Sequence, residues 1–440
     1  MTVRYGGHGP SDADDGVWLL APGTNGGGQP GPLVLDAHGR VVWFRPLRDG
    51  YFAMNLRVQR YQGQPVLTWW EGNLAGLAEG VIVDSSYREV ARVRAGNGHQ
   101  IDPHEFLLTP QGTALITCSP STVSHDLTPV GGAKDGQVYE SVIQEVDVQT
   151  GQVVMEWHSL DHVAVSESYM APGGVYDYLH VNSIDMAPDG HLLVSGRHTW
   201  ALYKLHRSTG EVIWRLGGKR SDFSMGRGTR FTWQHDARHV GDGKITVFDN
   251  GAAVFNFAQQ WRKSESQSRA LALEVDSVRR TVRLARQFRH HPPLLTIGYG
   301  NVQTLSDGDV VIGWGNAPVF THLTARGAPL QEITIPVAYS SYRALRQHWR
   351  GIPHRPPDLV ADRDASGRST TLYASWNGAT GVSAWRVSAG AHQGDLRPVA
   401  RKKRTGFETA IALTSTEGYA TVTALDRAGR PLATSSAIKL

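Results

Sequence analysis

The sequence lacks several features that would point to particular classes of protein. It has one cysteine, Cys118, in 440 residues, which excludes an intramolecular disulfide, a redox pair and a zinc cluster built from cysteines. The longest apolar run near its start, residues 17–21, is shorter than the roughly 7–15 residues of a signal-peptide core and the ~20 of a membrane-spanning helix. We expect a cytoplasmic protein as the sequence is written, or a secreted one if an export signal has been removed from it.

The sequence also lacks a large excess of charge of either sign. The chain has 44 Lys and Arg against 40 Asp and Glu, a net charge of +4, and its one basic run is residues 401–404. This distribution is too diffuse to argue for nucleic acid as a partner. No glycine-rich loop of the P-loop type is present for a nucleotide phosphate. We therefore expect neither nucleic acid nor a membrane as a partner.

Glycine is plentiful, with 49 residues, and it stands at the turns of recurring hairpins. Five segments have the pattern of a strand, a glycine turn and a strand: residues 55–70, 104–119, 182–197, 235–250 and 300–315. A second hairpin type, similar to Leu-x-x-Asp-x-x-Gly-x-Val-x-Trp, alternates with the first and is clearest at residues 33–43, 146–157 and 203–214. β-Branched and aromatic residues that alternate around glycine turns are typical of antiparallel hairpins, not of helices.

The alternation of the two hairpin types at about 50–70 residues predicts an all-β fold, a β-propeller of four-stranded blades. Six outer-type hairpins indicate six blades, and we expect residues 16–22 and 337–345 to pair and supply the missing inner hairpin. Residues 16–352 would be the six-bladed propeller, and residues 1–15 a disordered leader. After three prolines between 353 and 357, residues 358–440 would form a small β-sandwich of the fibronectin type III sort.

Polar residues occupy equivalent positions on the predicted inner strands. Eight residues before four of the turn glycines are Asn55, His104, Asn182 and His235, and seven residues after three of them are Trp70, Arg197 and Asn250. His180 lies two residues before Asn182, so both side chains are on one face of a strand. Because inner strands converge on one channel, we expect three imidazoles, a guanidinium and amides to meet there, with aromatic walls from Trp70 and Trp233. Such a set suits an oxyanion attached to a flat apolar group, without a metal.

Six short motifs follow one another on these hairpins: Asp-Pro-His-Glu-Phe at 102–106, His-Val-Asn-Ser at 180–183, Ser-Gly-Arg at 195–197, Trp-Arg-Leu-Gly-Gly at 214–218, Gln-His-Asp-Ala-Arg at 234–238 and Phe-Asp-Asn-Gly at 248–251. Together they resemble the bacterial arylsulfotransferases, over roughly residues 17–349. The resemblance implies a sulfotransferase that moves a sulfuryl group from an aryl sulfate donor to a phenolic acceptor. It implies no adenylylated sulfate donor and no cofactor.

The resemblance also implies roles for individual residues. His235 would accept the sulfuryl group and become a sulfohistidine, which gives ping-pong kinetics. His104, His180 and Arg197 would complete the catalytic set, and either His104 or His180 would serve as general acid and base. The expected substrate-binding residues are Asn182, Asn250, Trp70, Trp233 and Asn55.

Two other functions fit the same residues. The propeller could use its histidines as acid and base in a different reaction, a cyclisation or hydrolysis in secondary metabolism, because a fold does not fix a function. It could also be a non-catalytic propeller that binds partners through its blade rims. Release of a chromogenic phenol from an aryl sulfate that depends on an added phenol would separate sulfuryl transfer from both.

Overall fold

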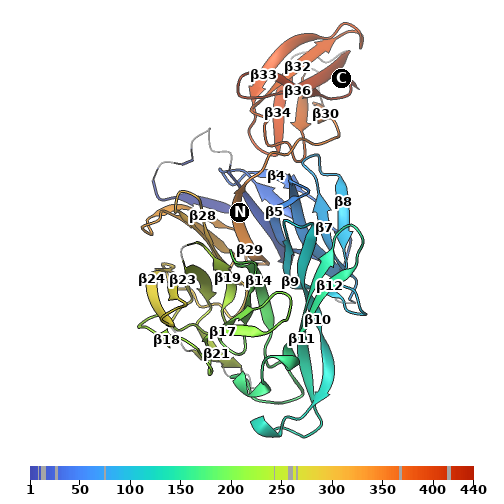
Figure 1. Ribbon diagram of the computed structural model, residues 1–440. Helices are drawn as coiled ribbons and strands as arrows, with labels where there is room; N and C mark the ends of the chain where they lie inside the picture. The colour runs from blue at the N-terminus through green and yellow to red at the C-terminus, as the bar shows by residue number, and fades with distance from the viewer. Residues whose placement is uncertain are drawn as a thin grey trace.

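The protein is built from β-strands in the computed structural model, which describes residues 1–7, 9–10, 16–24, 28–73, 76–241, 243–255, 261–263, 266–365, 369–413 and 418–440 (Figure 1). These ranges hold no α-helix and three 3-10 turns, at Thr128–Val130, Ser159–Asp161 and Val165–Glu167. The predicted all-β class is confirmed. No helix within the described ranges is long and apolar enough to cross a membrane.

The described residues among the first 349 form six large, mainly antiparallel sheets. The first sheet joins β29 (Tyr339–His348) to β2 (Gly16–Thr24), β3 (Leu33–Leu35) and β4 (Val41–Phe44). The second contains β5 (Tyr51–Tyr61), β6 (Gln64–Asn73), β7 (Ala78–Val83) and β8 (Glu89–Val93). The third contains β9 (Ile101–Leu108), β10 (Thr113–His125), β11 (Gly136–Asp147) and β12 (Val153–His158), with β13 (Val175–Tyr176) parallel to β11.

The remaining three sheets repeat the same pattern. The fourth contains β14 (Val181–Met186), β15 (Leu192–Gly196), β16 (Ala201–Leu205) and β17 (Val212–Gly217). The fifth contains β19 (His235–His239), β20 (Lys244–Asp249), β23 (Arg269–Asp276) and β24 (Thr281–Arg289), followed by β18 (Ser224–Met225). The sixth contains β25 (Asn301–Thr304), β26 (Val310–Gly313), β27 (Val319–Leu323) and β28 (Pro329–Thr334). A separate hairpin joins β21 (Ala252–Phe255) to β22 (Trp261–Lys263).

Glycine occupies the predicted turns because the backbone there is left-handed. Gly63, Gly112, Gly190, Gly243 and Gly308 have φ angles of 76°, 83°, 80°, 69° and 87°, a region that is costly for residues with a side chain. Each turn joins an innermost strand to the next strand of its sheet, from β5–β6 to β25–β26. The five inner hairpins predicted from the sequence are therefore observed.

The innermost strands lie next to one another in a propeller-like order. β29, β5, β9, β14, β19 and β25 contact in this sequence, and β25 also contacts β29. The pairing expected between the two ends is present, since β2 pairs with β29 from Gly16 opposite His348 to Thr24 opposite Tyr339. This order brings together the starts of β9, β14 and β19, which carry the predicted histidines.

Apolar side chains fill the space between neighbouring sheets. Leu115 and Ile184, from the third and fourth sheets, share one cluster, and Leu193 and Val247, from the fourth and fifth, share another. All four are fully buried, and burial of an aliphatic side chain of this size stabilises a fold by about 1.5–3 kcal/mol. These contacts fix how the inner strands lie against one another.

The prediction of a disordered leader over residues 1–15 is wrong for residues 2–5. Thr2–Tyr5 forms strand β1, which pairs antiparallel with β28 at the outer edge of the sixth sheet. Within this strand only Val3 is partly buried, and four residues are too few to show an alternating pattern in the sequence. Residues 8 and 11–15 of the expected leader lie outside the described residues.

The C-terminal residues form two further antiparallel sheets, drawn at the top of Figure 1. One contains β30 (Asp358–Arg363), β31 (Thr370–Ser375) and β34 (Glu408–Leu413). The other contains β33 (Arg397–Lys403), β32 (Ala384–Gly390), β35 (Tyr419–Leu425), β36 (Pro431–Thr434) and β37 (Ile438–Lys439). Leu372, Val387 and Val422 meet in a common core with Trp385, so the two sheets pack on each other.

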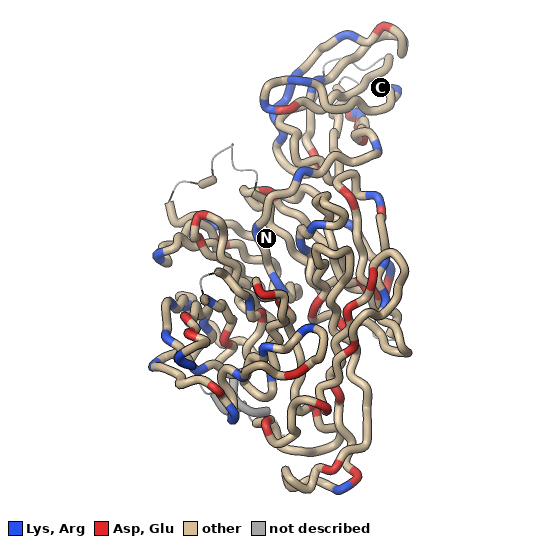
Figure 2. The backbone as a smooth tube through the Cα atoms, viewed as in Figure 1, with Lys and Arg blue, Asp and Glu red and all other residues tan. Residues whose placement is uncertain are grey.

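A loop of the C-terminal part covers the free edge of β4. The Phe44 amide donates to Asn377 Oδ1 (3.1 Å), Asn377 Nδ2 donates to the Phe44 carbonyl (3.0 Å), and the Gly378 amide donates to the Val42 carbonyl (2.8 Å). Unpaired sheet edges promote aggregation, and covering them is a common protection. Basic and acidic residues are interspersed along both parts of the chain (Figure 2), in agreement with the diffuse charge of the sequence.

Candidate active site

Three predicted histidines lie where neighbouring inner strands begin. His104 is in β9, His180 directly precedes β14, and His235 is the first residue of β19. The ring centroids of His104 and His180 are 5.1 Å apart, and the Tyr342 ring, from β29, lies 5.6 Å from His104 and 6.2 Å from His235. The side chains of His104 and His180 are 21% and 25% exposed, but His235 is only 2% exposed. The three imidazoles form one cluster, in which His235 is the most buried.

Hydrogen bonds select one tautomer of His235. Its Nδ1 lies 2.7 Å from Asn250 Oδ1 and 3.0 Å from the Trp233 carbonyl oxygen, and both atoms are acceptors, so Nδ1 carries the proton. Nε2 then holds a lone pair and accepts a weak bond of 3.3 Å from the Tyr299 amide. Burial lowers the pKa of His235 well below its usual value, and the positive charge of Arg197 adds to this effect. His235 is therefore a neutral imidazole with a nucleophilic Nε2 at neutral pH.

His104 and His180 are each paired with an aspartate that is close in sequence. His104 Nδ1 lies 2.5 Å from Asp102 Oδ1, and His180 Nδ1 lies 2.6 Å from Asp177 Oδ2. Burial lowers the pKa of His180, and Asp177 partly reverses this. Burial would raise the pKa of Asp177, but the interactions with His180, and then with His198 and Arg197, hold it well below the usual value. An ionised carboxylate that orients Nδ1–H leaves Nε2 available for proton transfer.

Arg197 is held beside the histidines by contacts on three sides. Its guanidinium lies 4.0 Å over the Trp233 ring, and Nη2 donates to the Ile297 carbonyl at 2.8 Å. Nη1 lies 3.0 Å from His198 Nε2, and His198 Nδ1 donates to the Asp177 carbonyl at 2.6 Å. Burial lowers the pKa of His198 to about 3 and that of Arg197 to about 10. Arg197 is thus a fixed cation and His198 a neutral residue that positions it.

Strained backbone is concentrated around these side chains. His180, Trp233, Asp236, Tyr299 and Asn55 have φ angles of 55°, 52°, 54°, 63° and 62°. A left-handed conformation costs a residue with a side chain about 1–3 kcal/mol, and such residues tend to cluster at functional sites. His235 lies between two of them, so its position is imposed by the surrounding structure and not by local preference.

A buried network of charged side chains lies next to the histidine cluster, and its Arg343 donates to the His104 carbonyl. Glu105 is 0% exposed, and its carboxylate lies 2.5 Å from Arg238, 3.0 Å from Arg57 and 3.2 Å from Arg343. Arg343 and Arg238 also reach Asp236, at 2.7 Å and 2.8 Å. Burial would raise the pKa of Glu105, but these three guanidinium groups lower it to about 2. Strands from four sheets are tied together at this point.

Two residues expected to bind substrate, Asn55 and Asn250, form hydrogen bonds within the protein. Asn55 uses Nδ2 to hold the Pro103 and His104 carbonyls, at 2.6 Å and 3.0 Å, and its Oδ1 accepts from Arg343. Asn250 Oδ1 accepts from His235, and its Nδ2 donates to the Tyr299 carbonyl at 3.2 Å. Both amides are therefore engaged in positioning the histidines and leave no free donor toward a ligand.

The remaining predicted residues separate into two groups. Trp70 is 3% exposed, lies in the core between sheets and donates Nε1 to the Ile101 carbonyl at 3.0 Å. Its assignment as an aromatic wall is therefore corrected, since strand periodicity does not say which face of a blade meets its neighbour. Trp233, by contrast, lies under Arg197. Asn182 is buried, donates Nδ2 to the Gln234 carbonyl at 2.7 Å, and leaves Oδ1 without a partner among the described residues.

Sequence reasoning missed several residues of the site: Tyr342, Asp177, His198 and the arginines at 57, 238 and 343. Asp102 stood in a quoted motif and Asp177 three residues before His180, so a search for acidic residues next to each histidine would have found both. Tyr342 and Arg343 come from β29, inside the segment expected to pair with the start of the chain. His198 directly follows Arg197 in the sequence and contacts its guanidinium in the structure.

Solved structures with a similar shape differ widely in sequence. A protein of unknown function from Bacteroides caccae has 12% identity and a TM-score of 0.46, with 76% of this chain and 98% of that chain covered. Virginiamycin B lyase from Staphylococcus aureus has 8% identity and a TM-score of 0.37, with 84% and 95% covered. Hydrazine synthase from Kuenenia stuttgartiensis has 13% identity and a TM-score of 0.36, with 67% and 70% covered. At these values the similarities say nothing about function.

Sequence comparison is more informative. No curated protein matches the chain, but a family model described as arylsulfotransferase (ASST) matches residues 57–334. The matched segment is more than half of the chain and includes His104, His180, Arg197 and His235. The resemblance predicted from the motifs is confirmed: the chain belongs to the arylsulfotransferase family.

Proposed function

We propose that this protein transfers a sulfuryl group from an aryl sulfate to a phenolic acceptor through a sulfohistidine at His235. Family membership supports a sulfotransferase-type enzyme that acts on small molecules. The observation that carries the finer proposal is the tautomer of His235, whose two acceptors hold the proton on Nδ1, so that the Nε2 lone pair is engaged by the weak 3.3 Å bond from the Tyr299 amide, which the donor would displace. A buried imidazole with a lowered pKa keeps this lone pair at neutral pH.

The first half-reaction forms a bond between His235 Nε2 and the sulfur of the donor. The bond from sulfur to the aryl oxygen breaks, and its electron pair leaves with the phenolate. Arg197 stabilises the negative charge on the sulfuryl oxygens, a contribution of about 2.7–4 kcal/mol for one oriented donor in related chemistry. One of His104 and His180, protonated at Nε2 and held by its aspartate, gives its proton to the departing oxygen.

The second half-reaction reverses these steps with a different phenol. The same histidine, now neutral, takes the proton of the acceptor hydroxyl, and the phenol oxygen attacks sulfur. The bond from sulfur to Nε2 breaks, and its electron pair returns to His235. Each half-reaction is balanced in protons and electrons, so it needs no oxidant or reductant. Kinetics of the ping-pong type follow, because the first phenol leaves before the second reacts.

The test uses the full chain with 4-nitrophenyl sulfate and an excess of phenol. We expect release of 4-nitrophenol that depends on phenol, and after donor alone an intact mass higher by about 80 Da, as covalent catalysis requires. His235→Ala should abolish both signals, and Arg197→Lys should slow release about 10²-fold or more. His239→Ala is the matched control, since His239 lies on the same strand but pairs with Asp185. A retained sulfo group in His235→Ala would overturn the proposal.

The two Asp–His pairs also favour a second candidate, acid–base catalysis of a cyclisation or hydrolysis on a phenolic or acyl substrate. In that case His235 would not be modified, and release of 4-nitrophenol would be absent for every aryl sulfate tried. Loss of the aspartates would still abolish the reaction. The intact mass after donor treatment therefore distinguishes the two candidates.

The proposal extends to the architecture. We propose that the six sheets of residues 16–352 are the blades of a six-bladed propeller, in which the inner strands surround the site. Residues 358–440 would be a fibronectin type III-like sandwich docked on β4. The cyclic contacts of the inner strands and the common core of the two C-terminal sheets support these assignments.

A further inference from the structure

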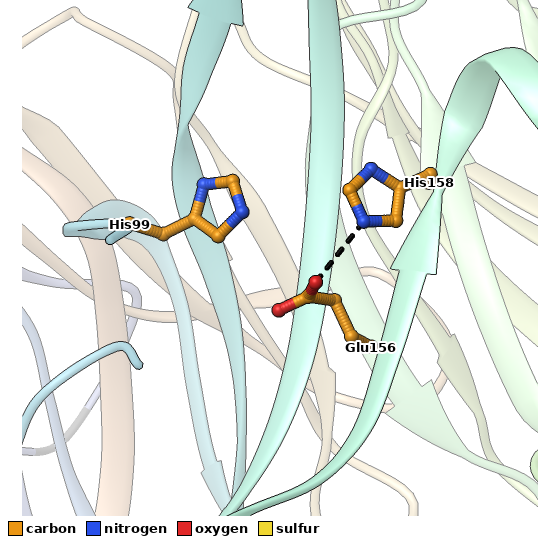
Figure 3. A group of neighbouring side chains, drawn as sticks. All are labelled: His99, Glu156 and His158. Atoms are coloured by element: carbon orange, nitrogen blue, oxygen red, sulfur yellow. Dashed lines mark hydrogen bonds and ion pairs between the residues drawn. The ribbon is translucent and has the colours of Figure 1, made fainter. Parts of the chain in front are cut away.

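A second group of ligating side chains lies at the outer strand of the third sheet and shares no residue with the candidate active site. Glu156 and His158 are on β12, and His99 is in the loop that precedes β9. Each offers one ligand atom, and these atoms all lie within 4.8 Å of one another. Figure 3 shows the three side chains converging from two separate segments. All three are half-buried, so the group is shielded but accessible.

The spacing of two of these ligands matches a tetrahedral metal. His158 Nε2 and Glu156 Oε1 are 3.1 Å apart. Bonds of about 2.0–2.1 Å to one zinc ion in tetrahedral geometry would place the two atoms about 3.3 Å apart. The ring centroid of His99 is 6.2 Å from that of His158. A small approach of the His99 loop would therefore complete three ligands around one ion.

Further side chains hold these ligands in orientations that suit a metal. His158 Nδ1 lies 3.1 Å from Glu140 Oε2, so Nδ1–H donates to Glu140 and fixes the ring while Nε2, deprotonated, would bind the ion. The other oxygen of Glu156 accepts from Asn97 at 2.8 Å and from Gln144 at 2.5 Å. Partners of this kind, on the far side of each ligand, are characteristic of metal sites.

An ion pair without a metal accounts for only part of this arrangement. A protonated His158 would satisfy Glu140 and Glu156 by itself, and it would not need His99. A metal ion would use all three side chains. The other group of three potential ligands, Asp177, His180 and His198, belongs to the candidate active site. There both nitrogens of His198 are engaged, one with a guanidinium, which disfavours a cation.

We propose that His99, Glu156 and His158 bind one divalent ion, with zinc as the best fit. Two imidazoles and one carboxylate are a typical donor set for zinc, with a fourth position left for water. The sequence predicts no metal, and it does not show this group, whose members, His99 and the two residues of β12, are far apart along the chain. The ion would tie the loop before β9 to β12, and this loop leads directly to Asp102 and His104.

The test measures zinc binding to the full chain after removal of metals with a chelator. Titration with zinc chloride, measured by isothermal titration calorimetry, should give one zinc per chain with a dissociation constant below about 1 μM. Zinc should also raise the melting temperature of the protein. His99→Ala and Glu156→Gln should each weaken binding by more than 100-fold. Glu140→Gln should weaken it by about 10–100-fold, as loss of an orienting partner does.

A surface histidine pair provides the matched control. His191 and His206 have ring centroids 4.6 Å apart, but they are not in any described group of three ligands. His191→Ala should leave the zinc affinity unchanged. Far-UV circular dichroism of His99→Ala checks that this loop variant stays folded.

Three results would overturn the proposal. The first is absence of zinc binding up to about 100 μM in the unaltered protein, far weaker than protein zinc sites. The second is binding that survives both His99→Ala and Glu156→Gln. The third is binding that is lost in His180→Ala but kept in His99→Ala, which would place the ion in the candidate active site.

Discussion

Replacing Glu105 with glutamine should destabilise the protein severely, because one buried carboxylate neutralises three arginines. Its contacts with Arg238, Arg57 and Arg343 span 2.5–3.2 Å, and the side chain is fully buried. Glutamine keeps the size of the side chain but removes the charge. Its amide hydrogens would then point at guanidinium groups that Asp236 alone cannot neutralise.

Two estimates of the magnitude agree. Removal of one partner from a buried ion pair costs about 3–5 kcal/mol, because an uncompensated charge stays buried. The difference between the ordinary pKa of 4.5 and a pKa of about 2 for Glu105 corresponds to about 3 kcal/mol of stability at neutral pH. We therefore expect Glu105→Gln to lower the free energy of unfolding by about 3–5 kcal/mol.

The pH dependence has a definite sign. The pKa of Glu105 is lower in the folded than in the unfolded protein, so its contribution is complete above pH 4.5 and is lost as the pH falls toward 2. The difference in stability between the unaltered protein and Glu105→Gln should therefore shrink over this window. At higher pH it should stay constant.

Urea unfolding followed by tryptophan fluorescence measures the effect, and an exposed ion pair supplies the comparison. Glu89 pairs with Arg92 at 2.7 Å, but its side chain is 40% exposed, so Glu89→Gln should cost less than about 1 kcal/mol. If Glu105→Gln costs no more than Glu89→Gln, or if its cost does not fall below pH 4.5, the reasoning about the buried network is refuted.

Three further predictions concern the candidate site and its surroundings. Burial lowers the pKa of His235, so sulfohistidine formation, measured by rapid quench, should not fall as the pH is lowered from 8 to well below 6.5; a fall near 6.5 would contradict this. Asp177→Asn removes the charged acceptor of His180 Nδ1–H, and initial rates with 4-nitrophenyl sulfate should drop about 10²-fold or more, without loss of melting temperature beyond a few degrees. Burial raises the pKa of the Cys118 thiol, so iodoacetamide at pH 8 should label it only after unfolding, as intact mass would show.

Features with a local cause were predictable from the sequence. The inner hairpins follow from a glycine at each left-handed turn and from alternation along each strand, both of which are visible in a single segment. His104 and His235 were found because the same count back from the turn glycine places them in equivalent strand positions. Arg197 was found by the count forward from the glycine, and His180 because it shares a strand face with Asn182. Pairing of the two ends was predictable from the one hairpin that the repeat pattern lacked.

Features that depend on contacts between segments were not predictable. Arg57, Arg238 and Arg343 come from different sheets, and nothing in the sequence shows that they share the carboxylate of Glu105. Whether an asparagine faces a ligand or a backbone carbonyl is also decided by neighbouring strands, as Asn55 shows. Trp70 stands at the same count from its turn glycine as Arg197, but Trp70 lies inside β6 and packs in the core, whereas Arg197 directly follows the end of β15.

The pairing of β2 with β29 has a consequence for synthesis of the protein. The Ala21 amide donates to the Ser341 hydroxyl, a residue 320 positions later. The ribosome adds roughly 5–20 residues per second, so β29 is synthesised about 15–60 s after β2, and one edge of β2 is unpaired during this time. During translation this apolar strand is open to wrong partners, so high-level expression should depend on chaperones that bind nascent chains. A circular permutant in which β29 directly precedes β2 would remove that wait.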